Sequence, residues 1–197
     1  MSAYSNACSD SELLEKFPQF ADRLAPWRKL ATLMGYTGPV AWLVKQGFTL
    51  KKRAQLAGPC HDNLREIHDL YWFRDYPTED CLVFWIPRLA EGSMRKGFEQ
   101  MEEYRAELKK RYELPGNHAT SFGSIQLLFA LIFAHFNFTG GERASLDRCS
   151  AMSDTRCVND HIFAGCFFDD GLDCNRHGLH IGDDVGFFLL GVEKIER

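Results

Sequence analysis

The stretch IQLLFALIFAHFNF, residues 125–138, decides the fold because it is the most apolar run in the chain. It is too short and, with His135 among its polar residues, too polar to span a bilayer. It is apolar on nearly every side of a helix, which is typical of a helix in the middle of a domain. Ser121 or Ser124 is placed to begin this helix and Gly140 to end it, so we expect a buried core helix.

On the N-terminal side of this run, helical spacing recurs in several segments. Residues 93–114 carry apolar side chains at steps of three and four, with charged residues between them, which predicts the clearest helix of the chain. Residues 61–73 show a shorter face of the same kind, and the glycine-punctuated segments before residue 58 predict an irregular helical layer. The continuous apolar run CLVFWI, residues 81–86, predicts a buried strand instead.

On the C-terminal side the helical period disappears. Residues 161–168 are expected to form a strand, residues 169–171 a tight hairpin turn, and residues 185–192 a last strand through the core. Together the patterns predict one α+β domain over residues 1–197, with residues 1–10 as a flexible N-terminus. We expect a helical N-terminal two-thirds and a buried central helix packed on a small, mainly antiparallel sheet that C-terminal hairpin strands complete.

Composition narrows the class of protein. Of the 197 residues, 45% are hydrophobic and 25% are charged, which is typical of a soluble globular chain. The net charge of −4, without any sustained basic segment, argues against nucleic-acid binding, and no membrane partner is expected. An odd number of cysteines (7) without a secretory signal favours reduced thiols and a cytoplasmic location.

Residues able to bind a metal gather near the C-terminus. Cys174, His177 and His180 lie within seven residues and could converge on one zinc ion, with Cys166 or Asp183 as the fourth ligand. The spacing lacks the Cys-x2-Cys pair that makes zinc sites recognisable, and buried cysteines are more often part of the core. Zinc is therefore a possible cofactor, and no other cofactor is implied.

Cys60 is the candidate nucleophile. It follows Gly58-Pro59 and stands where a helix could begin, a position that lowers the pKa of a thiol, and His61 is adjacent. Neighbouring residues of a helix point about 100° apart, so His61 is poorly placed to act as the base for Cys60. A cysteine in this position could also act as a redox sensor, although no Cys-x2-Cys partner is present to resolve it.

The loop before the apolar helix, residues 115–124, contains glycine and hydroxyl residues that suit either an anion-binding helix start or an ordinary cap. Capping is the simpler interpretation. His135 is expected to be a core histidine with one satisfied hydrogen bond.

Three functions remain open. The first is a non-catalytic binding or interaction module for an unknown protein or small-molecule ligand, and it ranks highest because no motif requires catalysis. The second is a zinc-binding protein that uses the C-terminal cysteine and histidines. The third is a hydrolase-type enzyme that uses Cys60 or C-terminal His and Asp groups. The oligomeric state is not determined by the sequence.

Overall fold

The computed structural model describes residues 4–62, 64, 74–115, 121–146, 149–157, 160–168, 171–177 and 183–195. Of residues 157, 160, 161, 166–168 and 175–177 it describes the backbone alone. The helices are α1 (Asp10–Lys16), η1 (Pro18–Phe20), α2 (Ala21–Leu33), α3 (Leu50–Ala57), α5 (Phe98–Arg111) and α6 (Ile125–Thr139). The strands are β1 (Ser5–Cys8), β2 (Ala41–Val44), β3 (Cys81–Trp85), β4 (Ser150–Cys157), β5 (Asp160–Phe168), β6 (Gly171–His177), β7 (Val185–Gly186) and β8 (Leu190–Lys194).

The described strands form two four-stranded sheets. The first has the order β1-β2-β3-β8 and is antiparallel throughout, with Ala41 opposite Phe84 and Val83 opposite Val192. The second has the order β6-β5-β4-β7, in which only the β4–β7 pair is parallel. The last strand of the chain therefore completes the first sheet, next to β3.

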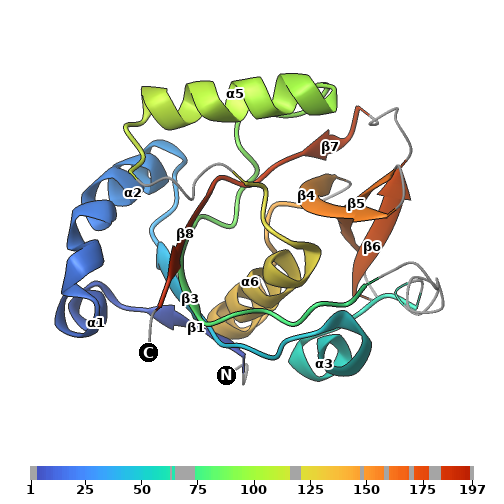
Figure 1. The fold of residues 1–197 in the computed structure, drawn as a ribbon, viewed down its shortest axis with the longest axis horizontal. Helices are drawn as coiled ribbons and strands as arrows, with labels where there is room; N and C mark the ends of the chain where they lie inside the picture. The colour runs from blue at the N-terminus through green and yellow to red at the C-terminus, as the bar shows by residue number, and fades with distance from the viewer. Residues whose placement is uncertain are drawn as a thin grey trace.

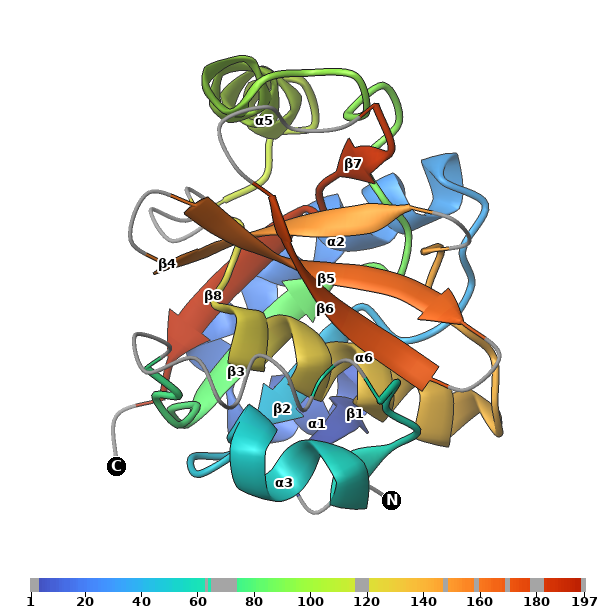
Figure 2. The same cartoon turned by 90° about the vertical axis from the view of Figure 1, so that its right-hand side faces the viewer.

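Helix α6 lies between the two sheets (Figures 1 and 2). It contacts β1 and β2 on one side, β4 and β5 on the other, and α3 as well. Every residue from Ile125 to His135 is buried. The Ser124 side chain caps its first turn, and Gly140 ends it in the left-handed conformation with φ of 74°. The prediction of a buried central helix is confirmed.

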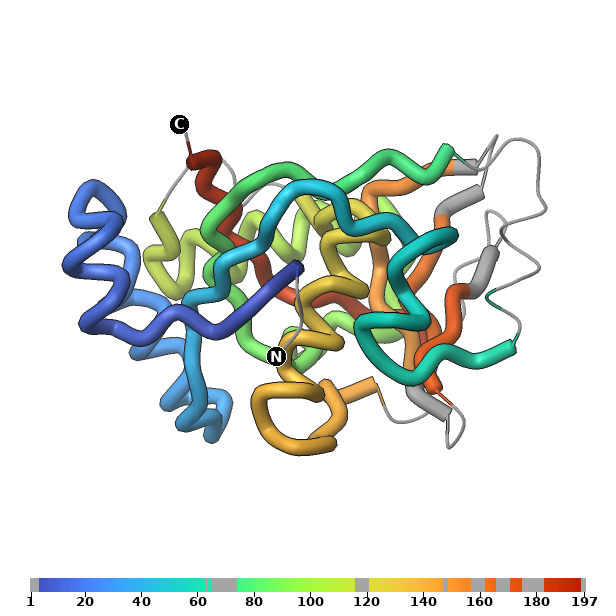
Figure 3. The backbone as a smooth tube through the Cα atoms, turned by 90° about the horizontal axis from the view of Figure 1, so that it is seen from below, coloured from blue at the N-terminus to red at the C-terminus, as the bar shows by residue number. Residues whose placement is uncertain are grey.

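The outer face of the first sheet is covered by α2. Trp27 and Leu30 of this helix belong to a second apolar cluster that also contains Leu82 and Phe84 of β3. The first sheet is thus packed on both faces, by α2 outside and α6 inside. In the tube view (Figure 3), α1 and α2 lie at the opposite end of the molecule from β5 and β6.

The expectation of a helical N-terminal two-thirds with one small sheet is wrong. Three strands of the first sheet, β1, β2 and β3, lie within the first 85 residues, and the described strands make two sheets rather than one. Ser5–Cys8, expected to be part of a flexible N-terminus, pairs with β2 as an edge strand. Its sequence, SNAC, lacks the alternation of apolar and polar residues that indicates a strand. Its strand conformation comes instead from the backbone pairing with β2.

Other expectations differ in detail. The helix expected over residues 93–114 is α5, and residues 81–85 of the expected strand form β3. The segment expected to be one last strand, residues 185–192, is divided between β7 and β8, which belong to different sheets. Most of the helix expected over residues 61–73 lies outside the described residues. In the described part of the chain, none of the helices is both long and apolar enough to cross a membrane.

Candidate functional site

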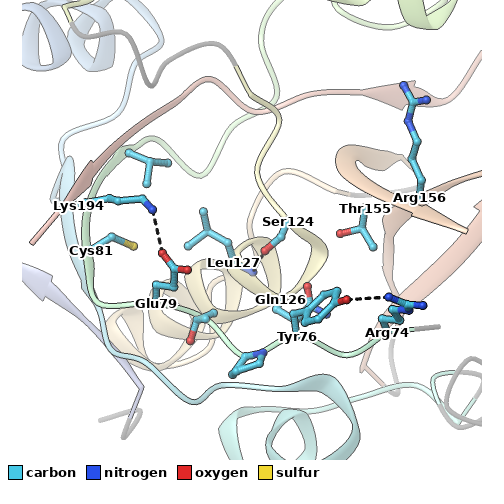
Figure 4. A pocket seen from close by; sticks show the side chains of 13 residues that line it. Arg74, Tyr76, Glu79, Cys81, Ser124, Gln126, Leu127, Thr155, Arg156 and Lys194 are labelled. Carbon is cyan, nitrogen blue, oxygen red and sulfur yellow. Dashed lines mark hydrogen bonds and ion pairs between the residues drawn. The ribbon is translucent and has the colours of Figure 1, made fainter.

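A cavity of about 530 Å³ opens at the N-terminal end of α6, between the two sheets (Figure 4). Its described walls come from β3 and β8 of the first sheet, β4 of the second sheet, the start of α6, and the segment of residues 74–79. Its apolar surface includes Cys81, Leu127 and Val192. Its polar surface includes Gln126, Thr155 and several charged side chains. Four stretches that are distant in the sequence, residues 74–81, 124–127, 155–156 and 192–194, therefore meet at this one site.

The start of α6 is held in place by β4. The carboxylate of Asp154 accepts hydrogen bonds from the backbone N–H of Phe122 at 3.1 Å and of Gly123 at 2.8 Å. The Thr155 hydroxyl oxygen accepts from the Ile125 N–H at 2.9 Å. These bonds satisfy amides that have no partner within the helix, and they fix the helix start against the cavity.

Asp75 holds the opposite wall. One of its carboxylate oxygens accepts from the Leu50 N–H at 3.0 Å and from Gln126 Nε2 at 3.1 Å, and the other accepts from the Lys51 N–H at 2.7 Å. Asp75 therefore caps α3 from outside that helix and at the same time binds the amide of a side chain in α6. Gln126 is only 2% exposed, so its amide needs this partner.

The charged residues of the cavity lie at its exposed rim. Lys194 forms an ion pair with Glu79 at 3.2 Å. Arg74 Nη1 donates to the Tyr76 hydroxyl at 3.2 Å, and the Arg156 guanidinium lies 5.5 Å from the centre of the Phe98 ring. In the described part of the chain, no carboxylate lies at ion-pair distance from either arginine.

Cys81 forms part of the cavity floor. Burial, together with the nearby negative charges of Asp80 and Glu79, raises the pKa of its thiol to about 12. The thiol is therefore protonated at neutral pH and contributes an apolar surface rather than a nucleophile.

Cys60 lies elsewhere, in an isolated bridge with Leu172 of β6. Burial raises the pKa of its thiol to about 12, and its Sγ donates to the Gly58 carbonyl at 3.6 Å. The expected lowering of the Cys60 pKa is wrong, because β6 covers this residue and removes it from water. The adjacent His61 donates its backbone N–H to the Leu172 carbonyl at 3.1 Å. Neither residue lines the cavity described above.

The predicted zinc ligands are only partly within the described structure. Cys174 is buried in β6, and burial, followed by the charges of Asp173 and Asp75, raises the pKa of its thiol. The side chains of Cys166 and His177 lie outside the described residues, as does His180. Among the side chains that the structure does describe, no group of three His, Cys, Asp or Glu residues could hold a metal ion. The zinc site therefore stays a prediction.

His135 is a core residue, as expected, but the expected hydrogen bond is missing. Its side chain is fully buried, with its ring centre 6.2 Å from those of Trp42 and Trp85 and 6.3 Å from that of Tyr36. Neither ring nitrogen has a hydrogen-bond partner in the described part of the chain. Burial lowers the pKa of the imidazole, and the charge of Glu142 only partly opposes this.

This environment predicts a pH-dependent stability. An ordinary imidazole binds a proton near pH 6.5, whereas folded His135 does so at lower pH. As pH falls below 6.5, the unfolded chain therefore gains a proton that the folded chain does not, and the free energy of unfolding decreases. We expect His135→Leu to be less sensitive to acid than the unchanged protein when urea unfolding is measured between about pH 7.5 and pH 5. Equal slopes in both proteins would contradict this assignment.

The capping interpretation of residues 115–124 is confirmed at Ser124, whose hydroxyl oxygen accepts from the Leu127 N–H at 3.2 Å. Residues 116–120 lie outside the described structure. Ser124 also lines the cavity. Ser124 therefore both caps α6 and contributes to the wall of the cavity.

Comparison of the chain with protein families, with characterised proteins and with solved structures finds no match. The described cavity lining includes none of the residues predicted from the sequence as catalytic or as metal ligands. Sequence reasoning missed Arg74, Gln126 and Arg156, because a lone arginine or glutamine in the sequence does not indicate a binding site. The loop before α6 was the one signal that pointed near this place.

Proposed function

We propose that the protein is a non-catalytic binding module whose ligand is a small organic molecule held in the cavity at the start of α6. The observation that carries this proposal is the cavity itself: its volume of about 530 Å³ is in the usual range for small-molecule sites. It combines apolar walls with a few polar groups, as such sites commonly do. Gln126 supplies a buried polar group among those walls.

The chemistry of the described lining favours binding over catalysis. A general acid or base works best when its pKa is near the working pH, and a cysteine nucleophile must be able to form a thiolate. The Cys81 thiol has its pKa raised to about 12, and the Glu79 carboxylate is paired with Lys194. These groups are suited to shaping and orienting a ligand.

Filling the cavity tests the proposal. Val192 is half-buried on β8 and lines the cavity, so Val192→Phe places a ring in the space that the ligand needs. We expect the unchanged protein to bind a neutral solvatochromic dye such as Nile red. We expect Val192→Phe to weaken that binding by roughly tenfold or more, because the added ring occupies the volume.

The control is Leu33→Phe, which places a ring at a position that is 65% exposed and outside the described cavity lining. Circular dichroism of both variants confirms folding, and fluorescence titration measures dye affinity. Equal dye affinity in Val192→Phe and the unchanged protein would argue against the cavity as the binding site.

A further inference from the structure

The two ends of the cavity differ in net charge (Figure 4). On one side lie Cys81 and the ion pair between Lys194 and Glu79. On the other side lie Arg74, Thr155 and Arg156, with Leu127 between the two ends. A ligand that fits such a space has an apolar portion and a polar end group.

The polar end carries positive charge that is not neutralised within the described structure. Arg74 donates to a tyrosine hydroxyl and Arg156 lies against a phenylalanine ring, so neither is paired with a carboxylate there. The chain as a whole has a net charge of −4, whereas this end of the cavity carries two arginines that have no carboxylate partner among the described residues. An arginine guanidinium is well suited to bind a carboxylate or phosphate oxygen.

The start of α6 adds hydrogen-bond donors at the same cavity. Ser124 and Thr155 each use the hydroxyl oxygen to accept a backbone N–H, from Leu127 and Ile125 respectively. Their hydroxyl hydrogens are thus left to donate, and both residues line the cavity. The positive end of the α6 dipole also favours an anion at this point.

Gln126 contributes an acceptor whose orientation is fixed. The Asp75 carboxylate can only accept, so the amide nitrogen of Gln126 must face it, and the bond is 3.1 Å long. The amide oxygen is then the group left for the cavity, and no donor contacts it in the described part of the chain. Gln126 is only 2% exposed and lines the cavity, so its almost completely buried side chain presents this acceptor at the cavity wall.

We propose that the ligand is an amphipathic organic anion with a carboxylate or phosphate head group. The head group lies beside Arg74 and accepts from the hydroxyls of Ser124 and Thr155, and Arg156, whose guanidinium is directed toward Phe98 of α5, adds positive charge at the same rim. The apolar portion lies against Leu127 and Val192, and a donor group on the ligand satisfies the Gln126 amide oxygen. This inference rests on the proposed function, since it names the chemistry of the ligand for the same cavity.

The test compares probes with the same chain and different head groups. Octanoate and octyl phosphate are anionic, 1-octanol is neutral, and octyltrimethylammonium is cationic; each is titrated against the protein loaded with the neutral dye. We expect the better of the two anions to displace the dye at a concentration roughly tenfold or more below that needed for 1-octanol, and the cation to be the weakest. The anion preference should decrease as salt is added.

The variant Arg74→Gln/Arg156→Gln is expected to lose the preference for anions while it keeps its affinity for 1-octanol. Both arginines are exposed at the rim, so the fold should tolerate the change. The matched control is Lys29→Gln/Lys52→Gln, which removes the same charge from exposed positions outside the described cavity lining. The control is expected to keep the full preference.

The outcomes separate the two proposals. If the dye and 1-octanol bind but anions bind no better than 1-octanol, the anionic ligand is refuted and the binding cavity stands. The same holds if the arginine variant keeps the preference of the unchanged protein. If neither the dye nor any probe binds, the proposed function fails as well. If both anions bind through the arginines, the tighter of the two identifies the head group.

Discussion

Alanine in place of Gly171 is expected to lower the free energy of unfolding by about 3 kcal/mol or more. Gly171 begins β6 with φ of +138°, a conformation that residues with a side chain rarely adopt. A Cβ there would also lie 2.6 Å from backbone atoms of Pro59 and Cys60. The contact cannot be relieved by a rotamer change, so the bridge between Cys60 and Leu172 must open. Urea unfolding followed by circular dichroism measures the effect.

Gly140→Ala is the matched control. Gly140 also has a positive φ, of +74°, but a Cβ there would meet no atom within 4 Å. Only the backbone strain remains, which costs about 1 kcal/mol. The difference between the two variants therefore reports the steric contact between β6 and the segment after α3 together with the greater backbone strain of a side chain at φ of +138°. A loss at Gly171 no larger than the loss at Gly140 would show that the strand does not approach that segment so closely.

Asp75→Ala is expected to cost about 3 kcal/mol, because one carboxylate serves two elements. Its removal leaves the Leu50 and Lys51 amides at the start of α3 without their acceptor. It also leaves the buried Gln126 amide without its partner. Equilibrium unfolding in urea measures the loss, and the surface variant Asp22→Ala serves as a control. Asp22 is exposed and, within the described part of the chain, pairs with Arg23 alone, so its loss should cost less than about 1 kcal/mol.

A double-mutant cycle separates the two roles of Asp75. Gln126→Leu removes the amide that needs the carboxylate, so Asp75→Ala should cost less in that background than in the unchanged protein. The cost that remains reports the capping of α3 alone. Strictly additive effects would mean that the bond between the two side chains contributes no stability.

An element of the fold could be predicted from the sequence where its own residues show a recognisable apolar pattern. Helix α6 was predictable because its apolar residues bury it whatever surrounds it. Helix α5 was predictable because its apolar residues recur at helical spacing. Strands β1 and β4 were not, since SNAC and SAMSDTRC contain mostly small or polar residues. Their strand conformation comes from pairing with β2 and with β5, which is a property of the tertiary structure.

The candidate site was less predictable than the fold. Arg74 and Arg156 are far apart in the sequence, and only the packing of α6 between the sheets brings them to one cavity. The candidate sites predicted from the sequence rely on cysteines. Two of these cysteines, Cys60 and Cys174, have side chains that the structure describes, and burial raises the pKa of both thiols and keeps them protonated. Composition shows which reactive groups a chain has, but their environment depends on which strands cover them.

The position of β8 has a consequence for the order in which the protein can fold during its synthesis. Sheet β1-β2-β3-β8 joins strands from near both ends of the chain, so it stays incomplete until residues 190–194 have left the ribosome. Until then β3, whose five residues are all buried in the finished molecule, has a free backbone edge on the side where β8 will pair. An unpaired apolar edge of this kind is a site for pairing with other chains. Chains that stop short of β8 are therefore the ones most exposed to aggregation and most dependent on chaperones.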